Sequence, residues 1–261
     1  MLVSSISTRT ELYAAPNKVW FPSHPTFDHD IELVTSGAAF RGGGYSPTAG
    51  LMQSGLWNSF VTSVSASIIV TVLCTGAGYV FARMRFKGKQ LSLFIMLMMP
   101  LPIWVALIAL FFIMSRAGLV DTIPGLVLLF VTFQIPLSVW LMATFVRDIP
   151  IEIEDAGLVD GANRWQLLRH LIFPLARPGI IAVFLVTLLT TWNSFLIPLV
   201  FTRTANSQTM TVVLTLFIGQ YEVAWESMAA AAVVTMLPPF LIALFFQRYL
   251  VRGLTLGAVK G

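Results

Sequence analysis

Five long stretches without charged residues dominate the pattern of hydrophobic and polar positions along the chain. Each stretch holds 21 to 26 residues. A helix needs about 20 predominantly apolar residues to cross roughly 30 Å of hydrocarbon, so each stretch is long enough to span a membrane. The pattern therefore predicts five transmembrane helices, at about residues 57–82, 91–115, 122–146, 178–202 and 227–247. A sixth apolar stretch, residues 210–218, is too short to span and predicts an interfacial or re-entrant helix or a packed loop.

The composition agrees with a membrane protein. Of the 261 residues, 57% are hydrophobic and 11% are charged, whereas a soluble domain averages about 45–50% apolar and about 25% charged residues. So few charges cannot cover the surface of a soluble domain, and buried core helices of a soluble protein become the weaker alternative. The single cysteine, Cys74, excludes a disulfide-stapled module.

The Lys and Arg residues give the chain an orientation. Three polar segments on one side of the predicted membrane, residues 83–90, 147–177 and 248–261, hold 11 of the 16 basic residues. The positive-inside rule places these segments in the cytoplasm and residues 1–56 outside. The outer segment contains no stretch long enough to span, so we expect that the usual first span is missing from this sequence and that the natural protein has six. The permease domain is then residues 57–247, followed by a cytoplasmic tail, residues 248–261.

Several kinds of transport chemistry have no support in the sequence. None of the four lysines stands in a Gly-x-x-x-x-Gly-Lys-Ser/Thr pattern, so no phosphate-binding loop is predicted. The predicted spans contain no acidic residue, whereas ion-coupled carriers usually hold ionisable groups at membrane depth. These features predict that the chain is not an enzyme and binds no cofactor, and that any transport is driven from outside it.

The loop at residues 147–177 predicts two short helices joined by a turn. Pro150 suits the first position of a helix, and the acids that follow it favour a helix N-terminus. Asp160 and Gly161 break the first helix, and Pro174 is expected to end the second, with Trp165, Leu168 and Leu171/Ile172 on one face. On physical grounds alone, an amphipathic elbow lying on the membrane surface remains an alternative.

The same loop resembles the EAA loop in permease subunits of binding-protein-dependent ABC importers. That signature reads Glu-Ala-Ala, three residues, Gly, nine residues, then Ile-x-Leu-Pro. Here Asp155-Ala156-Gly157 stands in place of Glu-Ala-Ala, Asp160-Gly161-Ala162 follows in register, and Leu171-Ile172-Phe173-Pro174 closes the pattern. The two departures are Asp155 for Glu and Gly157 for Ala.

Further motifs extend the resemblance to maltose-type carbohydrate permeases over nearly the whole chain. Residues 191–196, Thr-Trp-Asn-Ser-Phe-Leu, resemble the Trp-Asn-x-Phe-Leu of sugar permeases. Residues 82–88 resemble their Ala-Arg-x-x-Phe-x-Gly motif, and residues 247–261 are similar to their C-terminal ending. The resemblance implies an all-α transmembrane fold of the type I ABC importer permease class, with five spans visible here.

The resemblance also implies a coupling role for the loop, in which its first helix docks to a cytoplasmic ATPase subunit. The residues expected to carry this contact are Glu154, Asp155, Ala156, Gly157, Asp160, Gly161, Ala162, Arg164 and Trp165. Gly161 permits a tight turn, and a bulky β-branched residue would be poorly tolerated there if its backbone takes a positive φ. Trp165 and Leu168 are candidates to anchor the second helix against the bundle or the ATPase.

The implied partners are a second permease subunit, a dimer of ABC ATPase subunits that bind the ATP, an extracytoplasmic solute-binding protein and membrane lipid. The implied setting is the plasma (inner) membrane of a bacterium or archaeon, with several spans and a cytoplasmic C-terminus. The expected substrate is a sugar or related solute. A permease for a non-sugar solute, and an ATP-independent channel or secondary carrier, remain alternatives.

Polar residues within the predicted spans are candidates for the translocation path. They are Gln134, Thr191, Trp192 and Asn193. Hydrogen bonding between helices is an alternative role for the polar side chains, and packing is an alternative for Trp192. We expect Asn193 to face the path or a helix interface rather than lipid, because an unpaired amide in hydrocarbon is costly.

Overall fold

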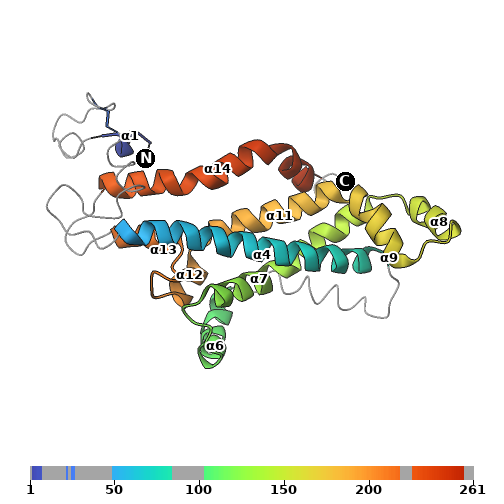
Figure 1. Ribbon diagram of the computed structural model, residues 1–261, viewed down its shortest axis with the longest axis horizontal. Helices are drawn as coiled ribbons and strands as arrows, with labels where there is room; N and C mark the ends of the chain where they lie inside the picture. The colour runs from blue at the N-terminus through green and yellow to red at the C-terminus, as the bar shows by residue number, and fades with distance from the viewer. Residues whose placement is uncertain are drawn as a thin grey trace. The chain divides into compact units, whose positions relative to one another are not determined.

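The computed structural model describes residues 2–7, 22, 25–26, 49–83, 103–217 and 225–255, and every regular element in these ranges is helical (Figure 1). This confirms the all-α fold. The elements in chain order are α1 (Leu2–Ser5), α4 (Ala49–Arg83), α6 (Ile103–Arg116), α7 (Ile123–Arg147), α8 (Ile151–Val159), α9 (Arg164–Leu167), the π-helix η1 (Leu168–Ile172), α10 (Phe173–Leu175), α11 (Arg177–Trp192), α12 (Leu196–Phe201), α13 (Met210–Val213), the 3₁₀-helix η2 (Leu214–Phe217) and α14 (Trp225–Thr255).

Three of the described helices are long and apolar enough to cross a membrane. They are Leu51–Arg83 within α4, Ile123–Arg147, and Met228–Gln247 within α14. A fourth candidate is the bent pair Arg164–Leu175 and Arg177–Trp192, whose axes meet at 73°. Residues 84–102, which precede the 14-residue α6, lie outside the described residues. The count of five spans therefore stays a prediction, as do the extracytoplasmic segment 1–56 and the tail 248–261.

The predicted span 178–202 is not one helix, which corrects that prediction. It divides into α11 and α12, with a break at residues 193–195. Pro198 has no N–H to donate to the carbonyl of Ser194, so the helical hydrogen-bond ladder cannot be completed there. The hydroxyl of Thr211 donates to that carbonyl instead, at 2.8 Å. The uncharged pattern shows where apolar residues lie but does not show where a backbone donor is missing.

The described residues form two compact units, each with a core of its own. The first comprises the described parts of Met1–Thr62, Phe111–Leu126 and Trp192–Ile242. Its core joins α4, α13 and α14 through Met52, Met210, Val213, Ala230 and Ala231. The described part of the apolar stretch at 210–218, residues 210–217, is therefore a short packed helical segment. Asn58 of α4 adds polar ties, since its side-chain amide donates to the carbonyls of Ala205 and Gln208, both at 2.9 Å.

The second unit comprises the described parts of Ser63–Leu110, Val127–Thr191 and Ala243–Gly261. Its buried apolar cluster joins one end of α4 and α7 to η1 and α11. The cluster consists of Tyr79, Met142, Val146, Ile149, Ile172, Ala176 and Val183. Gly78 permits close approach of α4 and α7, because a Cβ at this position would lie 2.8 Å from the side chain of Met142. This unit carries the loop 147–177, and Figure 1 shows α8 and α9 at the end of it.

Candidate coupling site

The first predicted helix of the loop is α8, and its end has a well-defined geometry. Gly161 follows the helix with a φ of 83°, so the condition under which a β-branched residue would be resisted there is met. The N–H of Gly161 donates to the carbonyl of Leu158 at 3.1 Å, and the N–H of Ala162 donates to that of Gly157 at 3.0 Å. This is the pair of bonds of a Schellman motif, which closes a helix and reverses the chain sharply.

The second predicted helix begins with α9, which is capped by side chains. The side chain of Asn163 accepts from the N–H of Gln166 at 2.9 Å, and the side chain of Gln166 accepts from the N–H of Asn163 at 2.8 Å. This reciprocal capping box fixes the start of the helix. α8 and α9 approach closely at Gly157, one of the two departures from the EAA signature, where an added Cβ would lie 2.5 Å from Cδ2 of Leu167.

Pro174 does not end the second helix, contrary to the sequence prediction. After α9 the chain changes to the π-helix η1, in which the N–H of Phe173 donates to the carbonyl of Leu168, five residues back. Pro174 has no N–H for the carbonyl of His170, so the ordinary α-helical ladder cannot pass through it. The chain continues through α10, and the 73° bend comes at Ala176, before α11 begins.

The apolar face of this second segment also differs from the prediction. Leu167 and Ile172 are buried and Leu168 packs against the buried cluster of the second unit. Trp165 points away, with 68% of its surface exposed. An anchor within its own unit is therefore excluded for Trp165, and its role as a contact for another protein stays a prediction.

Both apolar and charged side chains are exposed on α8, the turn and α9. We call these residues the α8–α9 surface; they are Ile151, Asp155, Ala156, Leu158, Val159, Asp160, Arg164 and Trp165, all exposed. Val159 is 87% exposed. Large apolar residues of this kind, held outward on short capped helices, are typical of a surface that binds a partner.

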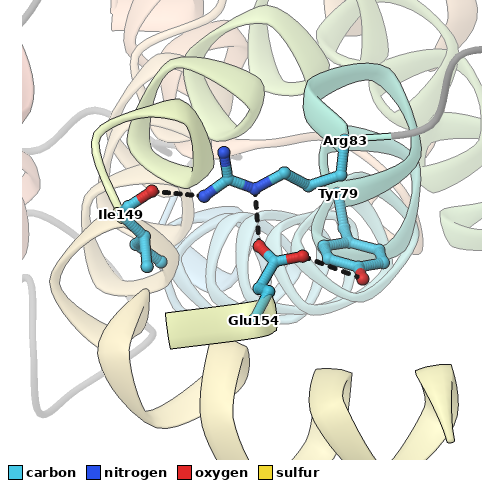
Figure 2. Close-up of polar contacts among 4 residues, drawn as sticks. All are labelled: Tyr79, Arg83, Ile149 and Glu154. Atoms are coloured by element: carbon cyan, nitrogen blue, oxygen red, sulfur yellow. Dashed lines mark hydrogen bonds and ion pairs between the residues drawn. The ribbon is translucent and has the colours of Figure 1, made fainter. Parts of the chain in front are cut away.

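Glu154 is the one predicted coupling residue that is buried, with 6% of its surface exposed. Figure 2 shows its carboxylate directed toward α4. Oε1 accepts from Nε of Arg83 at 2.5 Å, and Oε2 accepts from the hydroxyl of Tyr79 at 3.4 Å. A second guanidinium nitrogen of Arg83 donates to the carbonyl of Ile149. In the predicted list, Asp155, Ala156, Asp160, Gly161, Arg164 and Trp165 are exposed, Gly157 and Ala162 are partly exposed, and Glu154 alone is buried.

The translocation-path candidates fall in both units and are described in each by itself. In the second unit, the side-chain amide of Gln134 on α7 donates to the hydroxyl of Thr190 on α11. Thr191 is buried, and its hydroxyl has no hydrogen-bond partner among the described residues.

In the first unit, Trp192 is buried and donates from Nε1 to the carbonyl of Thr235 at 3.2 Å. Asn193 is exposed at the break after α11. Gln134 therefore forms the hydrogen bond between helices that was the alternative to a role in the translocation path. A role in that path stays a prediction for Gln134, Thr191, Trp192 and Asn193.

The sequence-based reading missed a row of hydroxyl side chains on α4. Ser59, Ser63, Ser67, Thr71 and Thr75 recur every fourth residue, and all are buried. Some hydroxyls donate back to their own helix; that of Thr75, for example, reaches the carbonyl of Thr71 at 2.7 Å. Small hydroxyl residues let helices in membranes approach closely. The spacing of four residues in the sequence could have predicted this buried row of hydroxyl groups.

Asp121 is a second residue that was missed, in the connection before α7. It has a φ of 62°, a region that Asp tolerates better than most residues. Its carboxylate accepts four hydrogen bonds, from the N–H groups of Arg203 and Thr204 and from the hydroxyls of Thr204 and Ser207. Burial raises the pKa of Asp121, but these hydrogen bonds favour the charged form more strongly, and the pKa falls to about 2. No spacing signal links residues that lie 82 and more positions apart.

Known proteins similar to this chain are transport permeases. Residues 74–256 match the family described as "Binding-protein-dependent transport system inner membrane component". The trehalose transport system permease SugB of Mycobacterium tuberculosis is 37% identical over 243 residues, which cover 92% of this chain and 84% of SugB. The trehalose/maltose transport system permease MalG of Thermococcus litoralis is 31% identical over 208 residues, which cover 79% of this chain and 75% of MalG.

A solved structure supports the same fold. It belongs to a bacterial ABC transporter involved in the import of the acidic polysaccharide alginate, and it matches with a TM-score of 0.77 and 20% sequence identity. The match covers 95% of this chain and 88% of the other. These findings confirm the type I ABC importer permease fold and the resemblance to maltose-type carbohydrate permeases. The chain belongs to the family of inner membrane components of binding-protein-dependent transport systems.

Proposed function

We propose that the chain is a permease subunit of an ATP-driven importer for a sugar or related solute, and that its α8–α9 surface docks to a cytoplasmic ATPase. The observation that carries the proposal is the geometry of this surface. Two short helices are fixed by a Schellman motif and a capping box, and they hold Val159 and Trp165 out into solvent. A surface that is both rigid and apolar can transmit a displacement, because little of the movement is lost in bending.

The proposed assembly contains a second permease subunit, two ATPase subunits that bind and hydrolyse the ATP, and an extracytoplasmic binding protein that delivers the solute. The family membership supports a multi-subunit assembly with a binding protein. In this assembly the chain itself needs no cofactor. The loop 147–177 and the C-terminus face the cytoplasm, which the distribution of Lys and Arg supports.

A sugar is favoured as the substrate over other solutes. The names of SugB and MalG refer to trehalose and maltose, and both relatives share at least 31% identity with this chain. Trp192 and Asn193 match the sugar-permease motif in the sequence. The choice of one sugar is expected to rest with the binding protein.

Co-purification tests the docking surface. The tagged chain is expressed with candidate ATPase and second-permease subunits from the same organism, and the ATPase retained on the tag is measured. Val159→Asp introduces a charge into the exposed apolar part of the surface and is expected to release most of the ATPase. Val159→Ile keeps the apolar, β-branched character and serves as the matched control.

Two outcomes would contradict the proposal. In the first, the wild-type chain purifies alone and still transports a sugar when reconstituted, as a carrier or channel would. In the second, Val159→Asp retains the ATPase as well as Val159→Ile does. A permease for another solute would retain the ATPase but show no binding-protein-dependent uptake of any sugar.

A further inference from the structure

Arg83 and Glu154 form a buried ion pair between two helices that are far apart in the sequence. Arg83 is the last residue of α4, and Glu154 lies in the first turn of α8, 71 positions later. Only 10% of the Arg83 side chain and 8% of the Glu154 side chain are exposed. The distance between Nε and Oε1 is 2.5 Å.

The pair makes more contacts than one salt bridge. The guanidinium of Arg83 also donates to the carbonyl of Ile149, in the connection between α7 and α8, as Figure 2 shows. Tyr79 lies one helical turn before Arg83 and donates to the other carboxylate oxygen. One end of α4 is thereby bonded both to the entry of α8 and to its first turn.

Packing alone does not account for charges at this place. The surrounding cluster is apolar, with Met142, Val146 and Ile172 buried, and Ile153 of α8 packs against it. Apolar residues of similar volume often replace a buried ion pair without loss of stability. The charged pair fixes the orientation and the register of α8 against α4, because a guanidinium binds a carboxylate at defined angles.

We propose that Glu154 is a positioning residue and not a contact for the ATPase, and that its ion pair with Arg83 makes α8 and the end of α4 move as one body. This rests on the proposed docking of the α8–α9 surface. When the ATPase displaces α8, the pair carries the displacement directly into the long helix α4. Without it, α8 would be joined to the spans through its chain connections, its apolar contacts and the long hydrogen bond from Tyr79.

The adjacent residue Asp155 gives a matched control. It lies on the same helix, carries the same charge and is exposed. Glu154→Gln keeps the shape of the side chain but removes the charge that pairs with Arg83. Each variant is prepared in the complete complex, and two quantities are measured: the ATPase that co-purifies, and the sugar taken up per ATP hydrolysed.

With Glu154→Gln we expect the ATPase to remain bound and the uptake per ATP to fall roughly tenfold, within the usual range of coupling free energies between two sites. Glu154→Asp retains the charge on a side chain one methylene shorter, and it is expected to recover part of the loss. Asp155→Asn is expected to weaken ATPase binding instead. Loss of the ATPase with Glu154→Gln but not with Asp155→Asn would overturn the proposal, as would unchanged uptake per ATP.

A spectroscopic measurement tests, without the ATPase, whether the ion pair of Arg83 and Glu154 ties α8 to α4. Spin labels are placed at Glu152→Cys on α8 and Val80→Cys on α4, in a chain whose one cysteine is replaced by Cys74→Ala. We expect a narrow distance distribution in this background and a broad one after Glu154→Gln. Equal widths would overturn the tie even if the ATPase docks as proposed. Failure of the wild-type chain to bind any ATPase would instead contradict the proposed function and leave this distance test valid.

Discussion

Carboxylates fix two connections of this molecule in different ways. Glu154 is buried and is neutralised by the guanidinium of Arg83. Asp121 is only half-buried and is held by four hydrogen bonds from N–H and hydroxyl groups. A charge removed from water needs a counter-charge, whereas a charge that keeps some solvent contact needs only donors. The two sites should therefore respond differently when a partner is removed.

The turn after α8 and the connection before α7 also handle a left-handed residue differently. The turn after α8 uses Gly161, at a φ of 83°, and the connection before α7 uses Asp121, at a φ of 62°. Glycine adopts such angles without steric cost. Aspartate does so at some cost, which its side-chain hydrogen bonds offset. The first turn depends on its backbone and the second depends on its side chain.

The largest expected effect comes from removing the counter-charge of Glu154. Arg83→Ala leaves a buried carboxylate unpaired and is expected to lower the free energy of unfolding by about 3–5 kcal/mol. Thermal unfolding in detergent measures this change. The double variant Arg83→Met with Glu154→Leu removes both charges and is expected to recover most of the stability. If the double variant is no more stable than Arg83→Ala, the comparison between the two carboxylates fails.

The second effect concerns the turn after α8. Gly161→Val forces a β-branched residue into a positive φ, at a cost on the order of 1–3 kcal/mol. We expect the turn to rearrange, so that ATP hydrolysis is uncoupled from uptake or the ATPase is released, while the spans still insert. Pull-down of the ATPase and binding-protein-stimulated hydrolysis measured together with uptake check this.

Asparagine provides the control for the turn. It tolerates the left-handed region better than valine does, so Gly161→Asn should retain most of the uptake. Among the described residues other than its two chain neighbours, no atom would lie within 4 Å of an added Cβ at this position, so crowding of the Cβ by other segments does not explain a loss. Full uptake by Gly161→Val would show that the turn does not matter for coupling.

The sequence predicted the helix–turn–helix and the turn at Asp160 and Gly161 because both depend on local chemistry. Proline, acidic residues and Asp-Gly specify helix ends wherever they occur. The same reasoning placed Pro174 at the end of a helix, and it was wrong because a π-helical turn removes the conflict that proline creates. The break at residues 193–195 was missed for the opposite reason, because an uncharged pattern does not show that Pro198 lacks a backbone donor.

Contacts between segments that are distant along the chain could not be predicted from the sequence. Glu154 and Asp155 are neighbours of one charge type, and the signature gives no means of telling which faces inward. Successive residues differ by about 100° around a helix, so one can be buried while the other is exposed. The direction is set by Arg83, and nothing in a single sequence pairs the two positions. The same holds for Asp121 and Ser207.

A smaller effect is expected at Asp121. Asp121→Asn keeps one carbonyl oxygen but removes the charge that strengthens the hydrogen bonds, and we expect a loss of about 1–2 kcal/mol in the free energy of unfolding at neutral pH. Thermal unfolding in detergent measures it, with Asp155→Asn as an exposed control. A loss as large as that of Arg83→Ala would contradict the proposed difference between the two sites.

The pH dependence at Asp121 sharpens this prediction. The pKa of the folded state is about 2, below the value of about 3.9 for an unfolded aspartate. The charged form therefore stabilises the folded state fully above about pH 4, and the contribution is lost as the pH falls toward about 2. The difference in melting temperature between wild type and Asp121→Asn should shrink over that interval. A constant difference would show that the hydrogen bonds do not depend on the charge.

The smallest effect is expected for Gly157→Ala, which restores the second alanine of the EAA signature. Alanine favours a helix by about 1 kcal/mol over glycine. Against this gain, the new Cβ would lie 2.5 Å from Cδ2 of Leu167, which must move. That atom is the end of a flexible side chain, so we expect the two contributions nearly to cancel and the melting temperature to change little. The double variant Gly157→Ala with Leu167→Ala tells the helix-propensity gain and the crowding apart. It removes the crowding but also a buried side chain, so we expect it to be destabilised by about 2–5 kcal/mol. A large loss in Gly157→Ala alone would show that α8 and α9 are packed too tightly for Leu167 to move, and that the glycine is required by the hairpin.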